Sequence, residues 1–303
     1  MKKIFIDGSA GTTGLRIYER LASRRDIQLI TLTEETRKNI NARRDALNGA
    51  DIAFLCLPDD AARESVSLVS NETTAIIDTS TAHRVSPGWV YGMPELDGQR
   101  GKISASKRIA NPGCHATGFI ALAAPLVQAG IVAKNEALTC FSLTGYSGGG
   151  KKMIAQYEDS KRDSLLDAPR QYGLSQSHKH LPEMTQVSGL EVPPVFCPVV
   201  APYYAGMEVT VSLHGKNIQA VKDCYRDYYH GGLIHFAENS DEGGFISAGK
   251  FSGRDDLEIS VYGNDERIIL VSRFDNLGKG ASGAAIQNMN ILLGIDETEG
   301  LNV

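Results

Sequence analysis

Residues 3–14 read KIFIDGSAGTTG, a stretch in which three apolar residues run into three regularly spaced glycines. The apolar run predicts a short buried strand over 3–7, and residues 15–22 predict a helix. Strand, glycine loop and helix form a variant of the dinucleotide fingerprint, in which the backbone holds a pyrophosphate at the helix N-terminus. We expect the following loop residues to bind a nucleotide: Gly8, Ser9, Gly11, Thr12, Thr13 and Gly14.

Further strands are predicted along the first third of the chain, at 28–33, 51–57 and 75–79. Helical stretches such as 61–69 separate them. This alternation predicts an α/β domain built on a doubly wound, parallel, Rossmann-type sheet. We expect residues 1–113 and 276–303 to form this nucleotide-binding domain.

The identity of the nucleotide depends on the residues about 20 positions beyond the glycine loop, where NAD enzymes place an acidic side chain on the ribose. Both signs of charge occur there. Glu34 would select NAD, whereas Thr33, Arg37 and Lys38 would hold the 2′-phosphate of NADP. The alternative is that all of these side chains are solvated loop residues.

The pattern changes after residue 113. Strands are predicted at 138–144, 196–200, 207–213, 257–262 and 268–274. Strict alternation in 207–213 indicates a sheet with one covered face, and 217–230 predicts the covering helix. We expect 114–275 to be an α+β domain on a mixed, largely antiparallel sheet, which carries the substrate contacts and a subunit interface.

The segment that follows, 275–283, leads into a helix rich in small residues over 284–293. Small residues at a helix start suit close packing against another element or a cofactor. We expect this helix to return to the first domain, and Asn276 and Lys279 to lie beside the cofactor.

Cys114 lies in the stretch Asn-Pro-Gly-Cys, immediately before the apolar helix predicted from residues 119–124. A cysteine in the first helical turn is stabilised as the thiolate, with a pKa lowered from about 8.5 to ~3.5–7.5 in known cases. Cys114 is therefore a candidate nucleophile. The alternative is a buried structural cysteine, the commonest fate of a free Cys, and this stretch alone does not decide between the two.

His178 and His180 precede Pro182, which would open a helix. Spacing of two places both imidazoles on one side of an extended segment. A metal site would need a third ligand, and no further His or Cys clusters nearby, so we expect no metal. Beside a thiolate nucleophile, one histidine is expected to move a proton on the reacting oxygen; the alternative is a surface pair.

Three basic residues are candidates for holding an anionic substrate. Arg84 follows the strand at 75–79, at the sheet edge where ligands bind, although a loop arginine is often only solvated. Lys151 and Lys152 follow the glycine run 145–150. Residues 145–152 resemble a P-loop, but Lys152 replaces the Ser or Thr that would hold Mg²⁺. We therefore interpret the segment as a mobile loop whose lysines face an anion.

Composition restricts the partners and the compartment. The chain has 303 residues, 42% hydrophobic, with a net charge of -5. This length predicts two domains, and the charge gives no reason to expect nucleic acid or an anionic membrane. Five scattered cysteines without a C-x-x-C pair suit a reducing cytoplasm, and no apolar run is long enough for a signal peptide or membrane span.

Six motifs together resemble the N-acetyl-gamma-glutamyl-phosphate reductase family in its shorter form. They are GSAGTTG at 8–14, STAHR at 80–84, YGMPEL at 91–96, NPGCHATG at 111–118, HKHLPEM at 178–184 and DNLGKGASGAAIQNMN at 275–290. The resemblance implies NADPH-dependent, metal-free, reversible reduction of N-acetyl-glutamyl 5-phosphate, a small acyl phosphate, to the semialdehyde. It implies that Cys114 forms a thioester, that His178 or His180 is the acid, and that the protein is a homo-oligomer, a dimer or tetramer.

The chain departs from the longer branch of that family at residues 115–116, His-Ala, where Tyr-Pro is usual, and in the glycine run 145–150. These departures favour the shorter branch. The nearest rival is another semialdehyde dehydrogenase, such as aspartate-semialdehyde dehydrogenase, which lacks the NPGC and H-x-H-x-P-E combination. A non-catalytic NADPH sensor is a rival from another class, and it would need neither Cys114 nor the histidine pair.

Overall fold

The computed structural model describes residues 1–303 and divides into two compact units. The first unit is Met1–Pro112 with Ala281–Leu301, and the second is Gly113–Gly280 with Asn302–Val303. Residues 276–280 thus belong to the second unit, not to the first as the sequence suggested. The Asn276 side chain ties this segment there, because it accepts from Gly206 N–H at 3.0 Å and donates to Ser147 Oγ at 3.0 Å.

The first unit contains a parallel sheet and five helices. Its strands are β1 (Lys2–Asp7), β2 (Ile27–Ile30), β3 (Ile52–Leu55), β4 (Ala75–Asp78), β5 (Val90–Tyr91) and β6 (Arg108–Ala110), and its helices are α1 (Thr12–Ala22), α2 (Ile40–Gly49), α3 (Asp59–Leu68), α4 (Gln99–Ala105) and α9 (Gly283–Leu293). The strand order is β2-β1-β3-β4-β6-β5. The order switches direction between β1 and β3, so their carboxyl ends form the crevice at which such sheets bind ligands.

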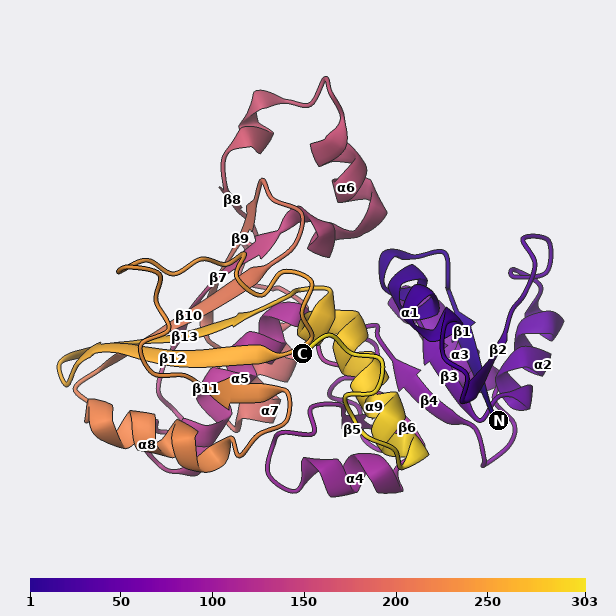
Figure 1. Ribbon diagram of the computed structural model, residues 1–303, viewed down its shortest axis with the longest axis horizontal. Coiled ribbons are helices and arrows are strands. Elements are labelled where there is room, and N and C mark those ends of the chain that lie inside the picture. The colour runs from indigo at the N-terminus through magenta and orange to yellow at the C-terminus, as the bar shows by residue number, and fades with distance from the viewer. The chain divides into compact units, whose positions relative to one another are not determined.

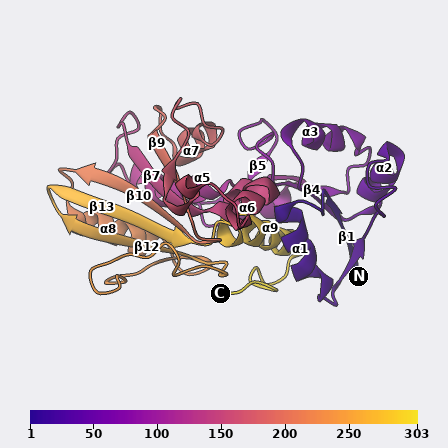
Figure 2. The ribbon, with the colours of Figure 1, turned by 90° about the horizontal axis from the view of Figure 1, so that it is seen from above.

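Both faces of this sheet are covered. Ile4 and Ile6 of β1 join a buried cluster with α1 and α9, whereas Phe5 joins a second cluster with α2 and α3. Figure 2 shows α3 and α2 on one side of β1 and β4, and α1 and α9 on the other. The doubly wound Rossmann-type sheet is therefore confirmed, and the helix 283–293 does return to the first unit.

The second unit is built on a seven-stranded sheet in the order β11-β12-β13-β10-β7-β9-β8 (Figure 1). Its strands are β7 (Thr139–Gly145), β8 (Arg170–Gln171), β9 (Val195–Ala201), β10 (Met207–His214), β11 (Ile234–Phe236), β12 (Leu257–Asn264) and β13 (Arg267–Phe274). Four strand pairs are antiparallel and two, β7 with β9 and β11 with β12, are parallel. This is the mixed, largely antiparallel sheet that the sequence predicts.

The remaining helical segments of this unit are α5 (Cys114–Gln128), η1 (Tyr146–Gly149), α6 (Gly150–Glu158), η2 (Ser164–Asp167), α7 (Leu181–Ser188), α8 (Ile218–Tyr228) and the π-helical turn η3 (Gly278–Ser282), which runs into the first unit. The run 145–150, which the sequence suggested as a mobile glycine loop, instead contains the last residue of β7, then η1 and the first residue of α6. Tyr146 explains why this segment has regular structure: its ring stacks on that of Tyr157 in α6, with the ring centroids 4.7 Å apart.

Helix α5 is buried along nearly its whole length and is pressed onto the sheet. A Cβ on Gly118 would lie 2.5 Å from Val209 of β10 and 2.8 Å from Phe274 of β13, so only glycine allows this approach. On the other side, Tyr225 and Tyr229 donate to the carbonyl oxygens of Leu122 and Ala121, at 2.6 and 2.8 Å. These contacts hold the middle of α5 between the sheet and α8.

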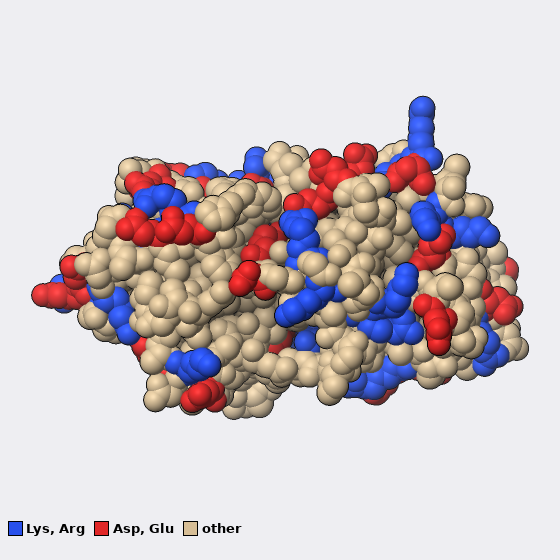
Figure 3. All heavy atoms as spheres, turned by 90° about the horizontal axis from the view of Figure 1, so that it is seen from below, with Lys and Arg blue, Asp and Glu red and all other residues tan.

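No helix has the length and apolar character required to cross a bilayer. On the face shown in Figure 3, acidic and basic side chains are interspersed among wide areas of other residues. This face presents no broad field of one charge.

Candidate active site

The glycine loop after β1 has the backbone geometry of a phosphate cradle. Gly8 has a φ of +88°, and a Cβ there would lie 2.3 Å from the Cys56 carbonyl oxygen after β3, so the loop passes through the switch point between β1 and β3. Helix α1 begins at Thr12 with Gly11 as N-cap, and no side chain caps it. The Thr12 hydroxyl is buried without a hydrogen-bond partner. The loop therefore leaves N–H groups and one hydroxyl for an anion.

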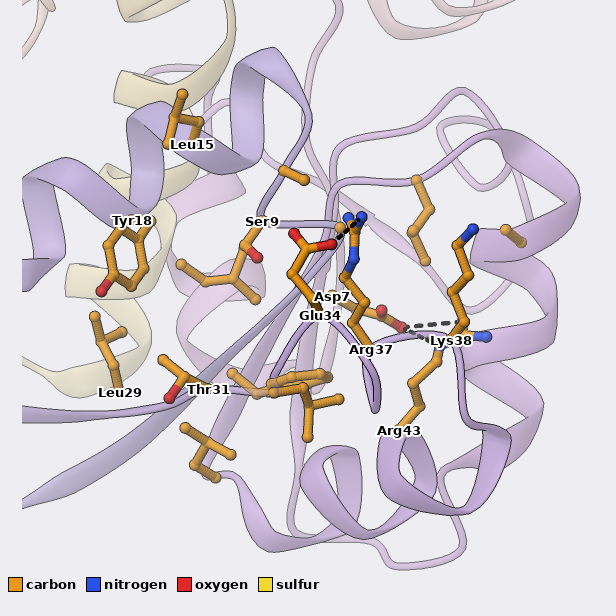
Figure 4. Close-up of a pocket in the computed structure, with 18 residues that line it drawn as sticks. Asp7, Ser9, Leu15, Tyr18, Leu29, Thr31, Glu34, Arg37, Lys38 and Arg43 are labelled. Atoms are coloured by element: carbon orange, nitrogen blue, oxygen red, sulfur yellow. Dashed lines mark hydrogen bonds and ion pairs between the residues drawn. The ribbon is translucent and has the colours of Figure 1, made fainter.

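A cavity of about 560 Å³ adjoins this loop (Figure 4). Its lining includes Gly8 and Ser9 from the loop, apolar side chains such as Leu15 and Leu29, and Arg37 and Lys38 from the segment after β2. An apolar slot with cations at its rim suits the adenosine half of a dinucleotide. The residues present thus fit a nicotinamide dinucleotide.

The charges around this cavity are already partly paired. Arg37 forms an ion pair with Glu34 at 2.8 Å, and both side chains remain exposed. Arg43 is buried and bonded to Asp7 Oδ2 at 3.1 Å, so it is committed to the fold. Lys38 also lines the cavity, whereas Thr33 does not: its hydroxyl bonds Thr36 within its own turn.

Arg84 lies at the carboxyl edge of the same sheet. Its guanidinium donates to the carbonyl oxygens of Asn111 and Thr79, at 3.1 and 3.2 Å. The loop that carries it is fixed by the buried Asp78, which bonds the His83 imidazole at 2.6 Å. The Arg84 side chain is half-buried and its guanidinium is held by two carbonyl oxygens. Arg84 is therefore not an ordinary solvated loop arginine.

Cys114 is the first residue of α5, as its sequence predicts, and its thiol is half-buried. Gly113 is the N-cap and has no side chain to satisfy the helix N-terminus. The Gly113 N–H donates to Glu183 Oε2 at 3.2 Å. The thiol therefore lies in the first turn, where the helix dipole favours a thiolate.

His180 and Glu183 form a buried pair beside this turn. Glu183 Oε1 lies 2.5 Å from His180 Nδ1, and both side chains are buried. Since the other oxygen of Glu183 bonds Gly113, one carboxylate connects the histidine to the residue before the cysteine. The carboxylate fixes Nδ1 as the protonated nitrogen, which leaves Nε2 for proton exchange.

His178 stacks on His180 with ring centroids 4.9 Å apart. The segment is a turn rather than the extended stretch that the sequence suggested, because the His180 backbone N–H donates to His178 Nδ1. The two imidazoles still lie side by side. No group of three or more His, Cys, Asp or Glu side chains has the geometry of a metal site.

The other predicted site residues are distributed over the second unit. Asn276 and Lys279 are buried there, and Asn276 supports Ser147 and Gly206. Lys151 and Lys152 are exposed on the first turn of α6. The structure thus places all four outside the unit that carries the glycine loop.

Sequence reasoning did not assign a role to Glu183, His115, Ser142 or Tyr172. The sequence did contain a signal for Glu183: it follows His180 by three residues, and on a helix that begins at this point such a spacing brings the two side chains together. The other three come together only through tertiary structure: His115 contacts Ser142 and Tyr172 on separate strands and loops.

Comparison with known families agrees with this architecture. The profile described as semialdehyde dehydrogenase, NAD binding domain, matches residues 3–104, and that described as semialdehyde dehydrogenase, dimerisation domain, matches residues 114–276. A Sinorhizobium medicae protein named N-acetyl-gamma-glutamyl-phosphate reductase is 47% identical, over 96% of this chain and 98% of its own. A Nostoc protein named N-acetyl-gamma-glutamyl-phosphate reductase 2 is 44% identical over 99% of both chains.

Solved structures show the same fold at low identity. Aspartate semialdehyde dehydrogenase II from Vibrio cholerae superposes with a TM-score of 0.71 at 16% identity, over 97% of this chain and 98% of that chain. The Candida albicans aspartate semialdehyde dehydrogenase, solved with NADP, gives 0.69 at 17% identity over 97% and 98%.

Proposed function

Because the chain belongs to the N-acetyl-gamma-glutamyl-phosphate reductase family, we propose that it reduces N-acetyl-L-glutamyl 5-phosphate to N-acetyl-L-glutamate 5-semialdehyde with NADPH, releasing phosphate, in arginine biosynthesis. The observation that carries the proposal is the position of Cys114 at the start of α5, with His180 and Glu183 beside it. A thiol nucleophile with an oriented histidine is the arrangement that acyl transfer requires.

The chemistry follows from these side chains. The Cys114 sulfur attacks the acyl carbon, the C–O bond to phosphate breaks, and a thioester remains on the protein. The nicotinamide cofactor, when bound, supplies the hydride that reduces this thioester. His180 gives a proton to the oxygen of the resulting thiohemiacetal anion and takes it back as the C–S bond breaks, which releases aldehyde and thiolate.

The direct test is consumption of NADPH by the purified protein in the presence of N-acetyl-glutamyl 5-phosphate, measured beside aspartyl 4-phosphate. Faster turnover of the first substrate supports the proposal. Preference for aspartyl 4-phosphate would make the chain an aspartate-semialdehyde dehydrogenase. Binding of NADPH without turnover of either would leave a sensor as the better reading.

We propose NADPH rather than NADH because Arg37 and Lys38 line the cavity beside the glycine loop. Arg37→Ala is expected to raise the KM for NADPH by about 10-fold, the scale of one charged contact to a phosphate, and to leave that for NADH unchanged. Arg44→Ala is the control, since Arg44 is exposed and outside the cavity lining. Better turnover of the unmodified protein with NADH would contradict the proposal and assign Glu34 to the ribose.

Arg84 is proposed to bind the acyl phosphate, because its guanidinium is held at the carboxyl edge of the sheet. Arg84→Ala is expected to raise the KM for the acyl phosphate by roughly 10- to 100-fold, with a much smaller change in the KM for NADPH. Arg100→Ala is the control, because Arg100 forms an exposed ion pair with Glu297. An unchanged KM for the acyl phosphate would remove Arg84 from the substrate site.

Lys151 and Lys152 remain proposed as secondary phosphate contacts, and Asn276 and Lys279 as cofactor contacts.

A homo-oligomer, a dimer or tetramer, is proposed from the sheet of the second unit. The face of this sheet turned away from α5 exposes large apolar side chains, which include Phe141, Val195 and Ile269. An exposed apolar face of this kind is a common subunit interface.

All five cysteines are free thiols, which suits a reducing cytoplasm, the compartment that we propose.

A further inference from the structure

His115, the residue after the nucleophile, joins two hydroxyl groups within the second unit. Its Nδ1 lies 2.6 Å from Ser142 Oγ, and its Nε2 lies 2.7 Å from Tyr172 Oη. The His115 side chain is 3% exposed and Ser142 is fully buried. Nothing in the proposed chemistry uses these three residues, yet His115 directly follows the nucleophile in α5.

This imidazole is neutral at physiological pH. Burial lowers the pKa of His115 well below its ordinary value, and the neighbouring rings of His180 and His178 lower it further. The pKa of Tyr172 is raised, chiefly by burial and also by the nearby Cys114 thiol, so its phenol keeps its proton. Three groups therefore share three protons: one on the imidazole and one on each hydroxyl.

These protons can be arranged in two ways. With the proton on Nδ1, His115 donates to Ser142 and Tyr172 donates to Nε2, so the Ser142 proton has no acceptor. Ser142 is fully buried and bonds only His115, and a buried donor without an acceptor costs about 1–3 kcal/mol.

With the proton on Nε2, Ser142 donates to Nδ1 and His115 donates to the Tyr172 oxygen. Every buried donor is then satisfied. The proton left over belongs to Tyr172, which is half-buried and whose pKa is raised by burial and by the Cys114 thiol. The second arrangement is therefore the stable one.

We propose that His115 is a positioning residue: fixed by Ser142 as the Nε2–H tautomer, it orients the Tyr172 hydroxyl so that its proton hydrogen-bonds the carbonyl oxygen of the acyl group on Cys114. The inference rests on the proposed reductase function and adds to it an oxyanion donor. A donor of this kind stabilises the charge that develops on that oxygen during attack and during reduction.

The tautomer can be observed in the resting protein without any substrate. Long-range proton–nitrogen correlation spectra of ¹⁵N-histidine-labelled protein distinguish Nε2–H from Nδ1–H, and His115→Gln identifies the His115 signals by their loss. We expect a neutral ring with its proton on Nε2. A proton on Nδ1, or a charged ring at neutral pH, would overturn the proposal.

Kinetics test the same network from its remote end. Ser142→Ala removes the hydrogen bond that anchors the ring at Nδ1, so the imidazole is held less firmly against Tyr172. We expect kcat to fall by about 10-fold, the scale of one lost buried hydrogen bond, with the KM for NADPH unchanged. Tyr172→Phe should lower kcat by about 100-fold, the scale of a lost oxyanion donor. The double variant should be no worse than Tyr172→Phe alone, because Ser142 acts through that hydroxyl.

Ser272→Ala is the matched control. Ser272 is equally buried, on β13 of the same sheet, and its hydroxyl also contacts α5, at the Gly118 carbonyl oxygen. It should retain kcat. Loss of activity in both serine variants, or additive effects of Ser142→Ala and Tyr172→Phe, would refute the relay. An unmodified protein that forms no aldehyde would instead refute the proposed function, independently of the tautomer.

Discussion

Cys114→Ala is expected to abolish reduction of the acyl phosphate while the Kd for NADPH changes by no more than about twofold. The thiol begins α5 in the second unit, whereas the glycine loop and its cavity belong wholly to the first. Removing the sulfur therefore removes the covalent step and leaves the cofactor contacts of the glycine loop and its cavity unchanged. Steady-state turnover and fluorescence titration of NADPH measure the two effects separately.

Cys114→Ser should be nearly as inactive, because a hydroxyl is scarcely ionised at neutral pH even at a helix N-terminus. The control is Cys197→Ser, a half-buried thiol on β9. Mass spectrometry after incubation with acyl phosphate and no NADPH should show the acyl adduct on the unmodified protein and on Cys197→Ser only. A Cys114→Ala protein that still reduces the acyl phosphate at a sizeable rate would mean that hydride reaches the acyl phosphate directly.

The features that the sequence predicted well are those written in short stretches. Residues 3–14 specify strand, loop and helix locally, because an apolar run, three glycines and a helix start follow one another without a gap. Asn-Pro-Gly before Cys114 likewise ends one element and lets the next begin at the cysteine. Alternation in 207–213 reflects a strand with one face on α5, and β10 has that burial pattern.

The features that were missed depend on partners far away in the chain. The glycines of the run 145–150 predict a flexible loop, but the ring of Tyr146 stacks on that of Tyr157 and gives the segment regular structure. His115 became a bridge only because folding brings Ser142 and Tyr172, 27 and 57 residues away, to its two nitrogens. Asn276 was assigned to the cofactor domain by its position before a returning helix, yet its amide bonds within the second unit.

His180→Ala is expected to lower kcat by on the order of 10² to 10⁴, with a smaller effect on the KM for the acyl phosphate, because a general acid acts mainly in the transition state. The sequence leaves both histidines as candidates for the acid. The structure separates them: Glu183 Oε1 lies 2.5 Å from His180 Nδ1, whereas His178 Nδ1 accepts from a backbone N–H. The Glu183 carboxylate is thus placed to orient His180 and to stabilise an imidazolium there.

His178→Ala is the matched comparison, since it removes the ring stacked on His180 and leaves the His180–Glu183 pair. We expect it to weaken substrate binding, with kcat lowered by less than about 10-fold. Glu183→Gln should lower kcat by about 10-fold or more, because the amide carries no charge to balance the imidazolium and its single oxygen can accept from only one of the two donors, His180 Nδ1–H and Gly113 N–H. If His178→Ala instead loses the larger share of kcat, His178 is the acid, and the carboxylate of Glu183 serves only to anchor the Gly113 N–H before the nucleophile.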